Sequence, residues 1–207
     1  MFNNMQPDPT PFPDRLRLPL DFDPERLAAD LAALSSVPWT AHFVQQNYEG
    51  DWSAIALRAP AGARHPIQMI LSSPGCTDFV DTPFLTGAPY FQRVLGQFAC
   101  PLLSVRLMRL APGSIIKEHR DHDLSFEQGT VRVHIPVVTN PAVDFRLNGT
   151  RCEMEAGSVW YLRLSDPHTV ANRGATGRVH MVIDAVVNGW IGDLFARACG
   201  TGHARAV

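Results

Sequence analysis

The sequence lacks the features that direct a protein to a membrane, to secretion or to nucleic acid. No apolar run approaches the roughly 20 residues that a membrane-spanning helix needs. The N-terminal segment MFNNMQPDPTPFPDRLRLP has neither the basic region nor the apolar region of a secretory signal. A net charge of -2 gives no overall excess of basic groups. We therefore expect a cytoplasmic protein that has neither nucleic acid nor a membrane as its partner.

Cysteine is scarce, and no two cysteines form a CxxC pair, so a zinc site built on thiolates is disfavoured. Their wide spacing gives no reason to propose a disulfide. We expect free, partly buried thiols at all four positions, which are Cys76, Cys100, Cys152 and Cys199.

The length of 207 residues and an apolar content of 45% suit one globular domain with a real core. The proline-rich residues 1–21 are expected to form an extended or disordered arm. A single domain is expected over 22–200, with its catalytic core at about 102–187, followed by a tail over 201–207.

Three segments have the periodicity of helices. Residues 23–34 begin with Asp23 as a candidate N-cap and Pro24 at the first helical position. Residues 89–98 place Phe91, Val94, Leu95 and Phe98 inward, and 188–199 is amphipathic around Trp190. The sequence leaves open whether this last helix seals the domain or forms a homodimer contact.

The remaining pattern is that of β-structure. Residues 73–88 are expected to form a long loop, and Asn148-Gly149 is the dipeptide that type I′ hairpin turns prefer. Many short strands separated by Gly and Pro turns indicate a sandwich or a barrel. The expected strands are 41–49, 52–59, 66–72, 102–110, 114–119, 129–140, a hairpin over 142–157, 158–164, 168–174 and 177–187.

The segment KEHRDHD, residues 117–123, concentrates imidazoles and carboxylates. In a strand, His119 and Asp121 project to the same side, as two ligands of one metal ion would. On its own, such a pair is more often part of a solvated turn. His168, which follows the turn set by Asp166-Pro167, is the best candidate for a third ligand. Two histidines and one carboxylate form the facial triad of non-haem Fe(II) oxygenases.

Arginines in the later strands strengthen this interpretation. Arg178 alternates inward with His180, and a buried guanidinium needs an anion, such as a dicarboxylate cosubstrate. The alternative is a structural ion pair, for example with Asp184. Arg132 and His134 share one face of their strand, which lines either a wet pocket or an ordinary solvated side of the sheet.

These motifs resemble the aspartyl/asparaginyl β-hydroxylase family, including its bacterial proline hydroxylase-like members. The resemblance rests on His119-x-Asp121, on VRVHIPVVTN with Arg132 and His134, and on PHTVANRGATGRVHMVID with His168 and Arg178. It implies a mainly β fold, the double-stranded β-helix or cupin-like jelly roll, with flanking helices. It also implies His119, Asp121 and His168 as the catalytic metal ligands. Arg178 would anchor 2-oxoglutarate, with Arg132 and His134 beside the cosubstrate or the substrate.

The implied activity is that of an Fe(II)- and 2-oxoglutarate-dependent dioxygenase. With O2, such an enzyme hydroxylates an amino acid or an amino-acid side chain and converts 2-oxoglutarate to succinate. Its substrate would be a small molecule or a peptide with an amino-acid moiety. The loops 73–88 and 122–130 are expected to select it, and its carboxylate would meet one of Arg120, Arg132 and Arg151. Two alternatives stay open, another metal-dependent cupin-type enzyme and a non-catalytic metal-binding module.

Overall fold

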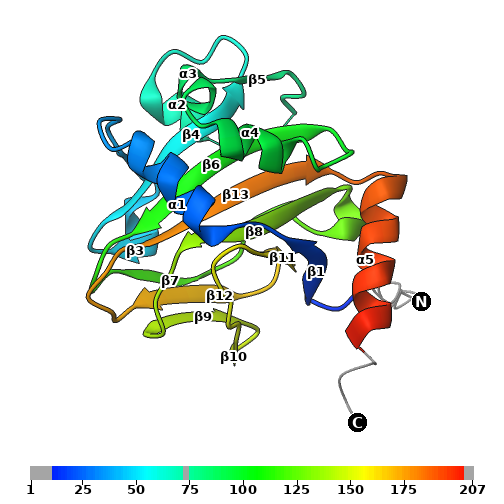
Figure 1. Ribbon diagram of the computed structural model, residues 1–207. Helices are drawn as coiled ribbons and strands as arrows, with labels where there is room; N and C mark the ends of the chain where they lie inside the picture. The colour runs from blue at the N-terminus through cyan, green and yellow to red at the C-terminus, as the bar shows by residue number, and fades with distance from the viewer. Residues whose placement is uncertain (1–10, 72–74, 203–207) are drawn as a thin grey trace, which may run out of the picture.

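Two antiparallel β-sheets dominate the computed structural model, which describes residues 11–71 and 75–202 (Figure 1). The large sheet has eight strands in the order β1-β11-β8-β13-β6-β4-β2, with β5 paired to β4. Its strands are β1 (Arg15–Asp21), β2 (Thr40–Ala41), β4 (Trp52–Pro60), β5 (Phe79–Asp81), β6 (Leu102–Leu110), β8 (Thr130–Val138), β11 (Ser158–Leu162) and β13 (Arg178–Val186).

The small sheet has five strands in the order β10-β9-β12-β7-β3. Of its neighbouring pairs only β9 and β10 are consecutive in the chain, and the turn between them is the predicted one. Asn148 and Gly149 both have positive φ, 50° and 73°, as a type I′ turn requires. The strands are β3 (Tyr48–Glu49), β7 (Ile115–His119), β9 (Val143–Leu147), β10 (Thr150–Arg151) and β12 (His168–Asn172).

Four of the helices, α1, α3, α4 and α5, cover the outer face of the large sheet (Figure 1), whereas α2 packs Ile70 with the cluster between the sheets. Asp23 caps α1, since its side chain accepts hydrogen bonds from the backbone of Glu25 and Arg26. The helix α5 buries Ile191, Leu194 and Phe195 against its own chain, so at least this face seals the domain. The helices are α1 (Pro24–Ala33), α2 (Pro66–Ile70), α3 (Pro83–Thr86), α4 (Pro89–Leu95) and α5 (Gly189–Gly202).

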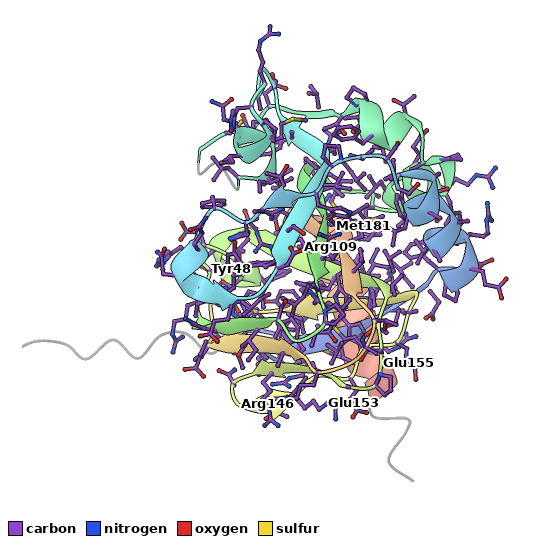
Figure 2. The ribbon with its side chains drawn as sticks, turned by 90° about the vertical axis from the view of Figure 1, so that its left-hand side faces the viewer. Tyr48, Arg109, Arg146, Glu153, Glu155 and Met181 are labelled. Atoms are coloured by element: carbon purple, nitrogen blue, oxygen red, sulfur yellow. The ribbon has the colours of Figure 1, made fainter. Side chains whose placement is uncertain are left out.

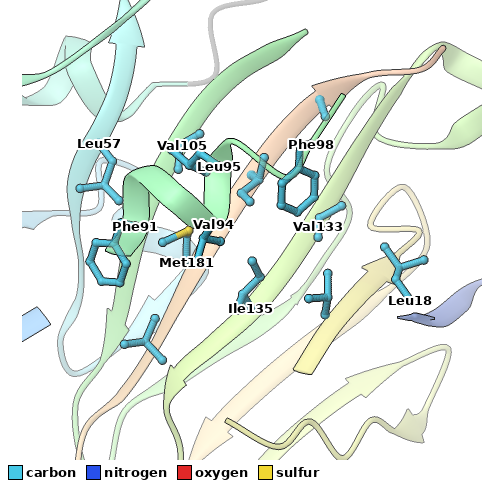
Figure 3. Close-up of a cluster of buried hydrophobic side chains, with 14 of the residues drawn as sticks. Leu18, Leu57, Phe91, Val94, Leu95, Phe98, Val105, Val133, Ile135 and Met181 are labelled. Atoms are coloured by element: carbon cyan, nitrogen blue, oxygen red, sulfur yellow. The ribbon is translucent and has the colours of Figure 1, made fainter. Parts of the chain in front are cut away.

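The strands of the large sheet alternate between two buried environments. Along β13, Val179, Met181 and Ile183 join a hydrophobic core with the helices, while the intervening residues face the other sheet. Figure 3 shows Val94 of α4 against Met181 in this outer core. A second hydrophobic cluster lies between the sheets and includes Met108, Phe145 and Val170.

Some local expectations were wrong. Residues 66–72, expected as a strand, form the helix α2 up to Ile70, because His65 caps it in a capping box with Gln68. Residues 41–49 contain two short strands and a 3-10 helix (Gln45–Asn47) rather than one strand. The expected loop 73–88 contains β5 and α3.

Part of the expected N-terminal arm is a regular strand. Residues 15–21, which fall in the expected N-terminal arm, form β1 and pair with β11. Residues 1–10, 72–74 and 203–207 lie outside the described part, and the domain boundaries stay a prediction.

All four cysteines are free, as expected. Within the described ranges, no helix combines the length and the apolar character needed to cross a bilayer.

Candidate active site

Three predicted ligand residues converge on the small sheet. His119 ends β7 and His168 begins β12, and the two residues lie opposite each other in the antiparallel register. Asp121 follows β7, and its backbone N–H donates to the carbonyl of Leu164 at 2.9 Å. The ligand atoms of His119, Asp121 and His168 all lie within 4.8 Å of one another. Strand pairing therefore brings His168 close to His119 and Asp121, which precede it by 49 and 47 positions, at a spacing that suits one metal ion.

Hydrogen bonds orient both imidazoles toward this centre. The Nδ1 atom of His119 lies 2.8 Å from the carbonyl oxygen of Lys117, and Nδ1 of His168 lies 3.0 Å from that of Asp166. Because a carbonyl oxygen only accepts, each Nδ1 carries the proton, and each Nε2 keeps a lone pair for a metal. Burial, reinforced by neighbouring His119, lowers the pKa of His168 to about 4, which keeps it neutral at neutral pH.

The opposite wall of the site carries a buried ion-pair network. Arg132 donates to Asp121 at 2.5 Å and makes a two-point contact with Asp184 at 2.6 and 2.9 Å. Arg106 joins the same Asp184 carboxylate at 2.8 Å. Burial alone would lower the pKa of Arg132, but Asp184 and Asp121 outweigh it and raise that pKa. The network thus connects a candidate metal ligand with two guanidinium groups.

Arg178 lies outside this network. It is 2% exposed, and its Nη2 donates to Nδ1 of His180 at 2.9 Å, while its Nε has no hydrogen-bond partner. The alternative of an ion pair with Asp184 is excluded, because that carboxylate contacts Arg132 and Arg106 instead. No acidic side chain of the described residues forms a salt bridge with Arg178. Burial without a carboxylate partner lowers the pKa of Arg178 to about 9.

His134 and His180 occupy the space beside Arg178. Both are buried, and their Nδ1 atoms are 3.4 Å apart. Burial first, and then the neighbouring charge of Arg178, lowers both pKa values well below the usual 6.5, so both imidazoles are neutral. The Nε2 atom of His134 has no hydrogen-bond partner. Of the two alternatives left open for the face shared by Arg132 and His134, a wet pocket and a solvated side of the sheet, the structure shows the pocket.

Apart from His180, which packs behind Arg178 and His134, these groups line one cavity of about 530 Å³ between the sheets. Its volume is typical of small-molecule sites. Both predicted loops contribute, through Gly75, Cys76, Thr77 and Phe79 and through His122, Asp123, Leu124 and Thr130. Sequence reasoning missed the segment around His42, where the imidazole stacks on Trp52 with ring centroids 3.5 Å apart.

Sequence reasoning also missed Arg106 and Ser104, which line the cavity from β6. The available signal was their alternation with Met108, the same pattern that identified Arg132 and His134.

Two of the proposed carboxylate partners are exposed and do not line the cavity. Arg120 donates to the carbonyl of Ser165, and Arg151 donates to the carbonyls of Pro141 and Val143. Figure 2 shows Arg146, Glu153 and Glu155 at the end of the molecule that carries the β9–β10 hairpin, apart from Tyr48.

Known proteins share the fold of this chain. A solved member of the 2OG-Fe(II) oxygenase family from Burkholderia pseudomallei has a TM-score of 0.53 at 17% identity, covering 84% of this chain and 85% of that one. The non-heme alpha ketoglutarate dependent epimerase SnoN has the same TM-score at 10% identity, covering 84% and 77%. The expected mainly β, jelly-roll fold with flanking helices is thereby confirmed.

Sequence comparison adds more specific relatives. L-proline cis-4-hydroxylase of Rhizobium meliloti (strain 1021) is 26% identical over 166 residues, which are 79% of this chain and 57% of the relative. L-proline cis-3-hydroxylase 1 of Streptomyces sp is 23% identical over 190 residues, which are 89% and 64%. This chain thus spans less than two thirds of the length of either relative. The sequence model of the family described as Aspartyl/Asparaginyl beta-hydroxylase matches residues 23–187. Since that match covers most of the chain, this protein belongs to the aspartyl/asparaginyl β-hydroxylase family.

Proposed function

We propose that this protein is an Fe(II)- and 2-oxoglutarate-dependent dioxygenase that hydroxylates a small amino acid. The observation that carries the proposal is the placement of three convergent metal ligands and an arginine without a carboxylate partner in one cavity. Family membership, and relatives named for the hydroxylation of L-proline, support the same reaction class.

The donor set fits Fe(II). His119 and His168 offer Nε2 lone pairs without charge, and Asp121 offers one carboxylate, which is the ligand combination of non-haem iron oxygenases. Arg132 holds one carboxylate oxygen of Asp121, so the other oxygen, 3.7 Å from Nε2 of His119, is the one available to a metal. Bound there, Fe(II) and 2-oxoglutarate supply oxidative decarboxylation to succinate and hydroxylation of a substrate C–H bond.

The site also fits the cosubstrate. The unpaired Nε of Arg178 is a buried donor, and a buried charge without a partner is costly. A distal carboxylate of 2-oxoglutarate would supply that partner through a charge-assisted hydrogen bond. The protein's part in the reaction is to bind and orient the reactants and to exclude water from the cavity. None of its side chains has to transfer a proton.

The test is consumption of 2-oxoglutarate by the Fe(II)-loaded protein, with free amino acids added one at a time. We expect slow consumption alone and faster consumption with the right amino acid. Asp121→Ala and His168→Ala should each abolish both metal retention, measured by elemental analysis after desalting, and 2-oxoglutarate consumption. Unchanged turnover in either variant would reject the proposal. Metal binding that 2-oxoglutarate does not stabilise would instead favour a cupin-type enzyme that uses no keto acid.

A further inference from the structure

We propose that the stacked rings of His42 and Phe43 receive the side chain of the amino-acid substrate, and that this side chain is uncharged, apolar and longer than the ring of proline. This inference rests on the proposed function and adds to it the class of substrate. Three observations carry it: the course of the aromatic rings along the cavity, the contacts that hold them in place, and the uncharged character of this part of the wall.

A row of three aromatic rings leads from the candidate metal ligands to the mouth of the cavity. The ring centroids of Trp52 and His119 are 6.2 Å apart. His42 stacks on Trp52 at 3.5 Å, and Phe43 stacks on His42 at 4.7 Å. Exposure rises outward along the row, from 7% for Trp52 to 42% for Phe43, and all three rings line the cavity.

Phe43 is an exposed apolar side chain that belongs to a binding cavity. Single exposed hydrophobic residues are common on protein surfaces, so their position decides what they mean. The other large hydrophobic side chains that are exposed in the described ranges do not line the cavity; they are Ile67, Val80 and Ile115. A substrate side chain that covers Phe43 removes apolar surface from water, which favours binding.

Hydrogen bonds and ring contacts hold this wall in place before a substrate binds. The backbone N–H of His42 donates to the carbonyl of Trp52 at 2.8 Å, and the hydroxyl of Tyr48 donates to the carbonyl of His42 at 3.2 Å. Tyr48, which is labelled in Figure 2, also packs edge-on against the rings of Trp52 and His42. Because these contacts already fix the rings, ordering them on binding costs little conformational entropy.

This part of the wall carries no charge. Burial first, and then the nearby charge of Arg106, lowers the pKa of His42 to about 3, so the imidazole is neutral at neutral pH. The other lining residues of the segment 42–52 are Phe43, Val44, Asn47 and Trp52, all with uncharged side chains. A charged substrate side chain would lose hydration here without meeting a counter-ion, whereas an apolar one would not.

The position of the wall also sets the length of the side chain. The C–H bond that reacts must lie beside the metal, at the ligand atoms of His119 and His168. The rings of Trp52 and His42 lie between His119 and Phe43 in the row. With its reacting carbon at the metal, the ring of proline would end beside Trp52. The side chains of L-norleucine and L-phenylalanine extend further, toward Phe43.

Phe43→Ala removes the outer ring of the wall. Ile67→Ala is the matched control, because Ile67 is 39% exposed, close to the 42% of Phe43, and lies outside the cavity. Each protein, loaded with Mn(II) and 2-oxoglutarate under nitrogen, is titrated calorimetrically with L-alanine, L-proline, L-norleucine and L-phenylalanine. L-Lysine and L-glutamate test charged side chains. Succinate formation by the Fe(II)-loaded protein is the second readout, and urea unfolding checks that each variant is folded.

We expect the wild type to bind L-norleucine or L-phenylalanine at least about tenfold more tightly than L-alanine, the scale of a few buried methylene groups. Phe43→Ala should weaken that binding about five- to tenfold, as for one lost aromatic contact. The dissociation constants of L-alanine and L-proline should stay within about twofold, because these side chains do not reach the ring. A general loss of structure would weaken all four alike. Phe43→Leu should recover part of the binding, and Ile67→Ala should behave as the wild type.

The outcomes separate this inference from the proposed function. If the wild type binds none of the neutral amino acids, or binds L-proline, L-lysine or L-glutamate more tightly than both longer apolar ones, the substrate class is wrong. If Phe43→Ala binds all four neutral amino acids as the wild type does, the wall does not receive the side chain. The proposed function survives both results as long as the wild type retains metal and consumes 2-oxoglutarate. If it does neither, the proposed function fails, and this inference fails with it.

Discussion

The two faces of the large sheet are both buried, yet they differ completely in chemistry. Toward the helices, β13 presents Val179, Met181 and Ile183 to a hydrocarbon core. Toward the small sheet, the same strand presents Arg178 and Asp184 to the cavity. The first face stabilises the fold through apolar burial, whereas the second holds charges in place at a cost in stability. The candidate site is therefore confined to one side of a strand whose other side is ordinary core.

The small sheet sharpens the contrast. It contributes the candidate metal ligands at the facing ends of β7 and β12, while the large sheet contributes all three buried arginines of the cavity. A metal centre on one wall and cationic groups on the other suit a ligand that spans the space between them. The four predictions below test this division, from the largest expected effect to the smallest.

Replacing Arg178 with Met should have the largest effect on cosubstrate binding, which should weaken while the stability of the unliganded protein rises. The KM for 2-oxoglutarate should rise on the order of 100-fold, since a buried charge-assisted contact is lost. The melting temperature of the protein without ligands should rise, because an uncompensated buried charge is removed. Steady-state kinetics and thermal unfolding measure the two effects. Arg173→Met, at an exposed arginine, is the control. A fall in the melting temperature together with the weaker binding of 2-oxoglutarate would contradict the prediction.

Replacing Asp184 with Asn should destabilise the protein by about 3–5 kcal/mol, because Arg106 and Arg132 lose their shared buried carboxylate. Urea unfolding measures this change. Asp81→Asn is a suitable control, since it breaks an ion pair in which the aspartate is mostly exposed. Equal losses in the free energy of unfolding for the two substitutions would show that the buried network stabilises the protein no more than an exposed ion pair does.

Met181→Ala should test the hydrocarbon face of the same strand. Met181 is fully buried in the core with the helices, and Figure 3 shows it beside Val94. The free energy of unfolding should fall by about 2–5 kcal/mol, as for other buried Met→Ala changes. The KM for 2-oxoglutarate should stay within about twofold of the wild type, because the side chain points away from the cavity. A large rise in that KM would mean that the two faces are energetically coupled.

Acidification should weaken the fold through the neutral histidines of the cavity face. The pKa of His180 is well below 6.5 in the native protein, so below pH 6.5 the unfolded chain binds a proton that the native state excludes. Its contribution to the free energy of unfolding therefore falls with decreasing pH, by up to about 1.4 kcal/mol per pH unit. Urea unfolding of the metal-free protein at pH 7 and pH 5.5 measures the slope. His180→Gln should flatten it, and an unchanged slope would contradict the assignment.

Much of the fold could be predicted because its signals are local. The strand β8 followed from its alternation, the β9–β10 turn from Asn148-Gly149, and the start of α1 from Asp23 and Pro24. The segment 66–72 was misjudged because its branched residues suggested a strand, while the capping of His65 and the fixed φ of Pro66 favour a helix. There, a helix-start signal outweighed the β-propensity of the side chains.

The candidate site was only partly predictable. His119, Asp121 and His168 carry ligand atoms recognisable by type, and their facing positions in the fold bring them together as expected. For Arg106 the sequence offered one signal, its alternation with Ser104 and Met108 along the strand. Its place in the cavity wall and the sharing of Asp184 depend on β6, β8 and β13 lying side by side in one register. Pairing between residues 41 or more positions apart leaves no local trace in the sequence.

By itself, the sequence determined which side chains share a face of each strand, because side-chain direction in a strand alternates with a period of two. It also determined the ligand types, since imidazole and carboxylate groups are recognisable wherever they occur. Only the tertiary structure decided which buried guanidinium meets a carboxylate and which is left without one. Ion pairing acts over a few ångströms. The distances between the charged groups are set by the register between strands that are far apart in the sequence.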